Sequence, residues 1–119
     1  MSEIKKVIAV FHYAEKIKTN LILTGSLLEA LSGMEETEVA GAEKILNAYL
    51  NALAGEVNIA STASGVQDFQ NINAKIREII EQIKMHNYAN ALKIVSEAIS
   101  VTTTHASQAA ETLVENNLI

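Results

Sequence analysis

The sequence predicts an all-α fold, an antiparallel four-helix bundle with up-down-up-down topology. Apolar residues recur at spacings of three and four along most of the 119 residues, as helices with one buried face require. Proline is absent, so no helix interior is interrupted by it. Glycine or asparagine breaks the pattern at three places, Ser32-Gly33, Ser64-Gly65 and His86-Asn87. Short turns between long helices make sequence neighbours antiparallel, and we expect residues 1–119 to form a single domain around one core.

The first predicted helix begins at the N-cap residue Ser2 and ends at Ser32. Weak helix formers are frequent in its second half, and Gly25 among them predicts a kink or a short break. Gly33 suits the left-handed position that follows a helix C-terminus. The residues expected to face the core are Ile4, Val7, Ile8, Phe11, Ala14, Ile17, Leu21, Leu28 and Leu31.

A capping box from Ser32 to Glu35 is expected to open the second helix. Glutamates follow in its first turn, where negative charge complements the helix dipole. The helix is expected to end between Ser61 and Ala63. Its predicted core face comprises Val39, Ala42, Ile45, Leu46, Tyr49, Leu53, Val57 and Ala60.

The third helix is the most clearly amphipathic segment, and a second capping box from Ser64 to Gln67 is expected to open it. Its predicted core face comprises Phe69, Ile72, Ile76, Ile79, Ile80 and Ile83. Asn87 is the expected cap of the last helix, which frays over 115–119. The predicted core face of that helix comprises Tyr88, Leu92, Val95, Ile99, Thr102, Ala106, Ala109 and Leu113.

Composition argues against several classes of function. The formal net charge of -5 disfavours nucleic-acid binding, which needs a basic surface. Cysteine is absent, so disulfides and thiolate metal sites are excluded. The apolar run at 7–11 is interrupted by charged residues well short of a signal sequence or a membrane span. We therefore expect a cytoplasmic protein with no nucleic-acid partner and no membrane partner.

The three histidines, His12, His86 and His105, are the first candidates for chemistry. Metal sites in carboxylate-bridged bundles need Glu-x-x-His motifs on two helices, and the sequence has no such motifs. We expect His12 in solvent, His86 as a helix-end cap, and His105 as a hydrogen-bonded structural residue. No phosphate-binding loop, nucleophile elbow or zinc-protease signature occurs. We expect no metal, no cofactor and no enzymatic activity, with a degenerate catalytic bundle as an alternative.

Charged side chains are missing from long stretches of the second and fourth helices. Glu56 is the sole charged residue in 45–67, and His105 is the sole ionisable residue in 98–110. Because interfaces are depleted in Lys and Glu, this pattern favours a protein-association module, either self-assembling or an adaptor. The expected partner is a second copy, giving a homodimer, or another helical protein. The candidate interface residues are Asn47, Asn51, Asn58, Thr102, His105 and Gln108.

The sequence leaves two alternatives open for these polar residues. In an antiparallel bundle the end of the second helix, the start of the third and the end of the fourth meet at one pole. The polar residues expected there are Asn58, Ser61, Thr62, Gln67, Gln70, Asn71, Thr102, Thr103, His105 and Gln108. If they point inward, the pole around His105 forms a pocket for a small ligand or ordered water. If they point outward, the pole is a plain polar surface.

Overall fold

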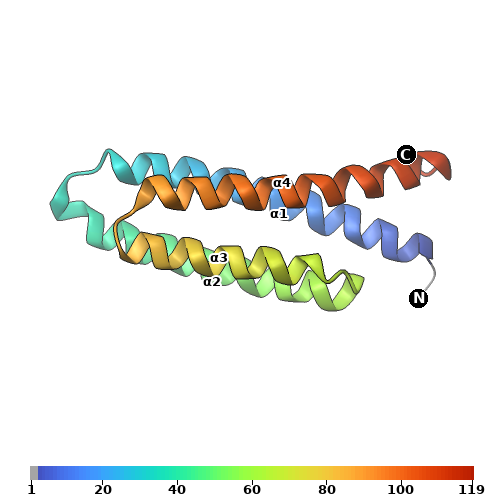
Figure 1. Cartoon of the computed structure of the whole chain (residues 1–119), viewed down its shortest axis with the longest axis horizontal. Helices are drawn as coiled ribbons and strands as arrows, with labels where there is room; N and C mark the ends of the chain where they lie inside the picture. Colours follow the sequence, from blue (N-terminus) through green and yellow to red (C-terminus); the bar gives the residue numbers. More distant parts are fainter. Residues whose placement is uncertain (1–2) are drawn as a thin grey trace.

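The computed structural model describes residues 3–119 and contains four helices in this range. They are α1 (Glu3–Ser32), α2 (Glu36–Ser64), α3 (Asp68–Lys84) and α4 (Tyr88–Glu115), as Figure 1 shows. The chain runs up and down through them in order, which confirms the predicted all-α four-helix bundle. The predicted N-cap at Ser2 lies outside the described residues.

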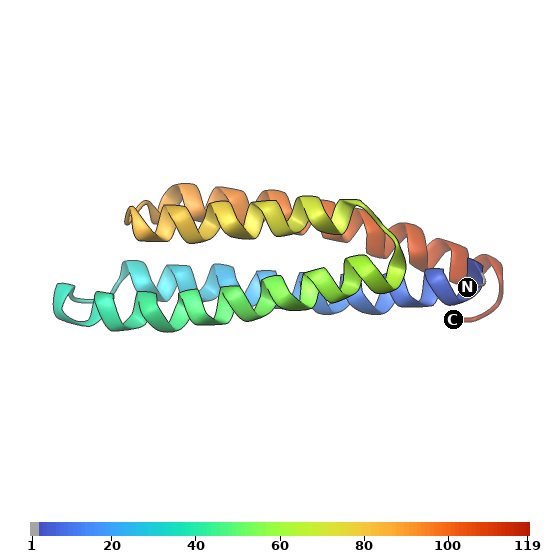
Figure 2. The ribbon, with the colours of Figure 1, turned by 90° about the horizontal axis from the view of Figure 1, so that it is seen from below.

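Each helix packs against two others, in the pairs α1–α2, α2–α3, α3–α4 and α1–α4. Figure 2 shows the molecule as two layers, one formed by α1 and α2 and the other by α3 and α4. The molecule is elongated, with extents of 53 × 21 × 17 Å. The α1–α2 turn projects beyond the α3–α4 turn in both Figure 1 and Figure 2, because α3 has 17 residues and α2 has 29.

The core is mainly aliphatic, and α3 contributes more of its large side chains than any other helix. All six residues predicted for the inner face of α3 are buried, including Phe69, the largest of the fully buried side chains. On α4 the buried face is partly made of alanine, because Ala91 and Ala98 are buried whereas Leu92 and Ile99 are half-buried. Small side chains at these positions let α4 approach its neighbours closely.

Two residues predicted for the core are exposed instead. Ile45 of α2 is 74 % exposed and Ile8 of α1 is 38 % exposed, so both core predictions are wrong. Leu46 and Leu50 are the buried residues of α2 in this region. Ile45 precedes Leu46 by one residue, which turns its side chain about 100° around the helix. Apolar spacing alone therefore did not distinguish the buried stripe of α2 from a second apolar stripe beside it.

The glycine positions differ from the sequence prediction. Gly65, and not Gly33, adopts the left-handed conformation, with φ 71°, and its N–H donates to the Ser61 carbonyl oxygen. α1 continues through Gly25, so the predicted short break is absent. A Cβ atom at Gly25 would lie 3.8 Å from a methyl carbon of Val95, an ordinary van der Waals distance, so the packing of α1 against α4 does not require glycine here.

Neither predicted capping box forms. The Ser32 hydroxyl donates to a carbonyl oxygen of its own helix. Ser64 is buried at the end of α2, where its hydroxyl donates to a carbonyl oxygen of α2 and accepts the N–H of Val66. The predicted cap at Asn87 is confirmed, since its side chain accepts the N–H of Asn90. Within residues 3–119, no helix has both the length and the apolar character that a membrane span requires.

Ile76 tests the core register. It is fully buried at the centre of α3, so Ile76→Ala should lower the free energy of unfolding by about 2–5 kcal/mol. The measurement is urea denaturation followed by circular dichroism. The exposed neighbour Glu78 provides the control, because Glu78→Ala should change stability by less than about 0.5 kcal/mol. Equal effects of the two substitutions would contradict this register of α3.

Candidate association surface

An apolar surface covers the outer side of the α1–α2 layer. Leu23 and Leu27 of α1 are 47 % and 38 % exposed, and Met34 in the α1–α2 turn is 41 % exposed. Ile45 and Ile59 of α2 are 74 % and 60 % exposed. Together with the small residues between them they form a surface that we name the α1–α2 face. Its members are Leu23, Leu27 and Ala30 of α1, Met34 of the α1–α2 turn, and Gly41, Ile45, Ala48, Ala52, Gly55 and Ile59 of α2.

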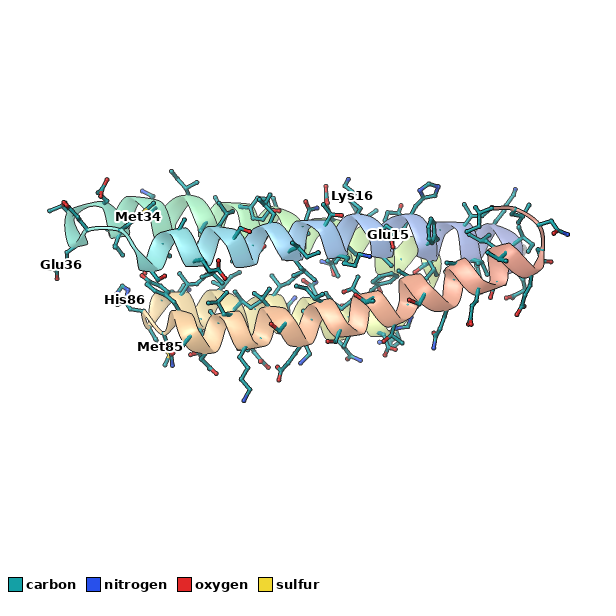
Figure 3. All side chains as sticks on the ribbon, turned by 90° about the horizontal axis from the view of Figure 1, so that it is seen from above. Glu15, Lys16, Met34, Glu36, Met85 and His86 are labelled. Atoms are coloured by element: carbon teal, nitrogen blue, oxygen red, sulfur yellow. The ribbon has the colours of Figure 1, made fainter. Side chains whose placement is uncertain are left out.

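The α1–α2 face has the spacing of a helix-packing stripe. Its members alternate steps of four and three residues on both helices, as in a heptad repeat. The core stripe of each helix is separate, since Leu28 and Leu46 are buried whereas the adjacent Leu27 and Ile45 are exposed. Figure 3 shows α1 and α2 side by side, with Lys16 projecting away from the α3–α4 layer. Each helix of this layer therefore carries two apolar stripes, of which one is buried within the chain.

A groove of about 300 Å³ lies in the α1–α2 face, near the turn that joins the two helices. Buried Leu31 and Leu46 line it together with exposed members of the face. Tyr49 lies at its margin, and its hydroxyl donates to the Asn20 carbonyl oxygen at 3.2 Å, which joins α2 to α1. The remaining lining residues are Leu27, Ala30, Met34, Ala42 and Ile45. Exposed apolar surface of this extent is typical of protein–protein contact sites.

The asparagines predicted for the interface lie along α2. Asn51 and Asn58 are exposed, and Asn47 is half-buried. The Asn58 side-chain oxygen accepts from the Asn73 amide of α3 at 2.9 Å. Asn73 is buried, and the sequence analysis did not single it out. At least one of the asparagines predicted for the interface, Asn58, therefore joins α2 to α3 within the chain.

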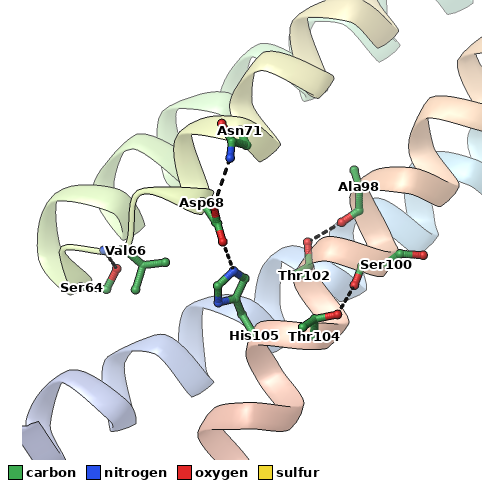
Figure 4. A network of polar contacts seen from close by, with 9 residues as sticks. All are labelled: Ser64, Val66, Asp68, Asn71, Ala98, Ser100, Thr102, Thr104 and His105. Atoms are coloured by element: carbon green, nitrogen blue, oxygen red, sulfur yellow. Dashed lines mark hydrogen bonds and ion pairs between the residues drawn. The ribbon is translucent and has the colours of Figure 1, made fainter.

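The α4 residues predicted for the interface have different environments. Thr102 is fully buried, with its hydroxyl donating to the Ala98 carbonyl oxygen, and so has no surface to offer a partner. Gln108 is exposed. The half-buried His105 lies 2.9 Å from Asp68, measured between Nε2 and Oδ2, as Figure 4 shows. Its ring also packs against Phe69, with 6.1 Å between the ring centroids. His105 is thus a hydrogen-bonded residue that joins α4 to the start of α3, as predicted.

The polar residues at this pole bond to one another on the surface. The Asn71 amide donates to Asp68 at 3.0 Å, and the Gln70 amide donates to Ser61 at 3.0 Å. An open cavity of about 240 Å³ lies beside His105, between α1 and α4. Its lining residues are Glu3, Lys6, Val7, Val10, His105, Gln108, Ala109 and Thr112. The polar side chains described at this pole bond to other residues of the chain. Ligand binding at the pole stays a prediction.

A second polar cluster lies at the opposite end of α3. Glu43 of α2 accepts the Tyr88 hydroxyl, and its Oε2 lies 2.7 Å from Nδ1 of His86. His86 was predicted to act through the helix dipole, but its side chain contacts this carboxylate on another helix. His86 has a positive φ of 59°, which places it in the tight turn between α3 and α4. The cluster joins this turn to α2.

The third histidine, His12, is exposed on α1, as predicted. Among residues 3–119 no group of three or more His, Asp or Glu side chains could hold a metal ion. Neither polar cluster includes a serine or threonine hydroxyl bonded to the imidazole, which a nucleophilic triad would need. Comparison of the chain with family models, characterised proteins and solved structures gave no match.

Burial raises the pKa of Tyr88 to about 12, and the hydrogen bond to Glu43 and its negative charge add to the increase. In the unfolded chain the same phenol ionises near 10. The unfolded state therefore loses this proton first, and the stabilisation falls as pH rises from about 10 to about 12. Glu43→Gln should lower the pKa of Tyr88 while leaving it above 10, because burial remains.

Difference absorbance at 295 nm between the chain and Tyr88→Phe measures this titration. Stability should also fall less steeply between these pH values in Tyr88→Phe than in the parent. A Tyr88 that titrates near 10 in the folded chain would contradict the contact with Glu43.

Proposed function

We propose that the protein is a helical association module that binds another helical surface through the α1–α2 face. One observation carries this proposal: large aliphatic side chains from two adjacent helices stay exposed at heptad spacing in the folded chain. Apolar residues scattered singly on a surface need no explanation, but a stripe shared by two helices is typical of a contact with further helices. The function does not require catalysis.

The energetics support a specific contact. A large aliphatic side chain that goes from half-exposed to buried contributes about 1 kcal/mol, half the value for complete burial. Five such side chains, on both partners, offset a substantial part of the translational and rotational entropy that association costs. The α1–α2 face contains no charged member, so its burial needs no desolvated ion pair.

The titratable clusters support a non-enzymatic role. Asp68–His105 and Glu43–His86–Tyr88 lie at opposite ends of α3, and the groups within each cluster bond to one another. Catalysis by general acid and base needs such groups to converge on one substrate. Cytoplasm is the compartment we propose, because a chain without cysteine gains no disulfide from an oxidising environment.

Ile45→Lys tests the proposal by placing a charge at the most exposed of the large side chains in the α1–α2 face. The parent chain should elute above the 12.9 kDa of one chain, either when purified or in an extract of its native cells. Ile45→Lys should elute as a single chain, because binding would bury an unpaired ammonium group. The measurement is size-exclusion chromatography with light scattering for the purified chain and with immunodetection for the extract.

The matched control is Met85→Lys, which adds the same charge at a methionine 64 % exposed in the α3–α4 turn, outside the α1–α2 face. It should behave as the parent does. A parent chain that elutes as one chain in both settings would contradict the proposed function.

A further inference from the structure

We propose that the occupant of the α1–α2 face is a second copy of the chain, docked so that α2 packs antiparallel against α2 of the partner. This inference rests on the proposed function and names its partner. It is carried by the arrangement of large and small residues on α2 and by the distribution of charge along the layer.

Two glycines on α2 have no role inside the chain. Gly41 and Gly55 lie in the interior of the helix, where each costs about 1 kcal/mol relative to alanine. A Cβ atom at either position would meet nothing within 4 Å, so the packing of the chain does not require glycine there. Both are exposed members of the α1–α2 face. They leave shallow depressions on the surface that a partner's side chain can fill.

The isoleucines of the same stripe fit these depressions in one antiparallel register. That register places Ile45 opposite the partner's Gly55, and it also places Ile59 opposite the partner's Gly41. Twofold symmetry repeats both contacts, which gives four pairs of a large residue against a small one. A shift by one heptad in either direction loses these pairings. A parallel arrangement would place isoleucine against isoleucine and glycine against glycine.

Ala48 and Ala52 occupy the centre of this register. Each lies opposite the other in the partner, so the two helices meet through methyl groups near the twofold axis. Small residues at the crossing allow an interaxial distance near 8 Å, the lower end of the usual range. A specific interface buries about 800 Å² per partner, so we expect docking through the 29-residue α2 to include α1 beside it.

The distribution of charge along the α1–α2 layer also favours an antiparallel partner. Three glutamates lie within 35–38 at the turn end of the layer, where Figure 3 labels Glu36. His12 and Lys16 are exposed further towards the N-terminus of α1, and Lys16 also pairs with Glu56 at 3.2 Å. An antiparallel partner brings its acidic end towards this basic segment. A parallel partner would bring the acidic ends together, which disfavours that arrangement.

An exchange of large and small residues tests the register. Gly41→Leu fills the depression that the partner's Ile59 occupies, and Ile59→Ala removes the side chain that enters it. Each single variant should raise the dimer dissociation constant about tenfold or more, which corresponds to about 1.4 kcal/mol. The double variant Gly41→Leu with Ile59→Ala should recover most of the affinity, because it restores one large and one small residue at each contact. Sedimentation equilibrium of the purified chain measures these constants.

Two controls test whether Gly41→Leu impairs folding and whether its effect on association depends on its position. Gly41→Leu should keep or raise the melting temperature at concentrations where the chain is monomeric, since leucine favours helix and has open space there. Ala40→Leu adds the same side chain at the adjacent exposed position, about 100° around the helix, and should leave the dissociation constant unchanged.

The outcomes separate the two proposals. An unchanged or lower dissociation constant for Gly41→Leu, or a double variant as weak as the worse single variant, overturns the proposed register. A purified chain that stays monomeric at 100 μM, about the range of a weak dimer, overturns the second copy as partner. If an extract complex then disappears with Ile45→Lys and persists with Met85→Lys, the association module stands with a different helical partner. If no complex forms in either setting, both proposals fail.

Discussion

Burial of the isoleucine-rich face of α3 beneath the other helices is the contact on which the bundle depends. Phe69 and Ile76 are fully buried on this helix, although it is the shortest of the four. Removing this much aliphatic surface from water is the dominant stabilising term available to a chain without disulfides. Polar contacts then fix α3 at both ends, through Asp68 with His105 at its start and through the turn residue His86 with Glu43 at its close.

The unequal use of apolar residues distinguishes the two layers. The outer side of α3 carries charged residues such as Arg77 and Glu78, which keep that surface solvated. The outer side of α1 and α2 carries exposed leucine and isoleucine separated by alanine and glycine. The outer side of α3 is therefore solvated, whereas the outer side of the α1–α2 layer has the composition of a helix-packing surface. This difference is the physical basis for assigning association to the α1–α2 face.

The fold could be predicted from the sequence because helical period, turn residues and length all agreed. All six residues predicted for the inner face of α3 are buried, since charged residues occupy many of its outer positions and fix the orientation, whereas the burial of Asn73 was not predicted. On α2 the exposed Lys44 directly precedes Ile45, but residues 45–55 are uncharged, so two adjacent apolar stripes gave one ambiguous pattern. The buried stripe through Leu50 became clear when the neighbouring helices were in place.

The polar contacts were harder to predict than the helices. Asp68 and His105 are 37 residues apart, and their pairing depends on how α3 and α4 are placed against each other. The asparagines of α2 were predicted as interface residues because sequence alone does not show that Asn58 contacts Asn73 of α3. Serines near the turns suggested capping boxes, but the Ser64 hydroxyl donates within its own helix. In each case the hydrogen-bond partner lies in another part of the fold or is set by local backbone geometry. Neither can be predicted from the spacing of residues in the sequence.

Directed disulfide formation across the α1–α2 face tests the central claim most directly, and the cysteine-free chain suits it. The proposed register places Ala48 opposite the partner's Ala52, so a mixture of Ala48→Cys chains and differently tagged Ala52→Cys chains should oxidise mainly to the mixed dimer. Cysteines on facing helices bridge only when their Cα atoms lie within about 7 Å. Ala40→Cys, outside the face, should cross-link poorly with either chain. Mixed and unmixed dimers in statistical proportion, or yields no higher than that of Ala40→Cys, would contradict antiparallel pairing through this face.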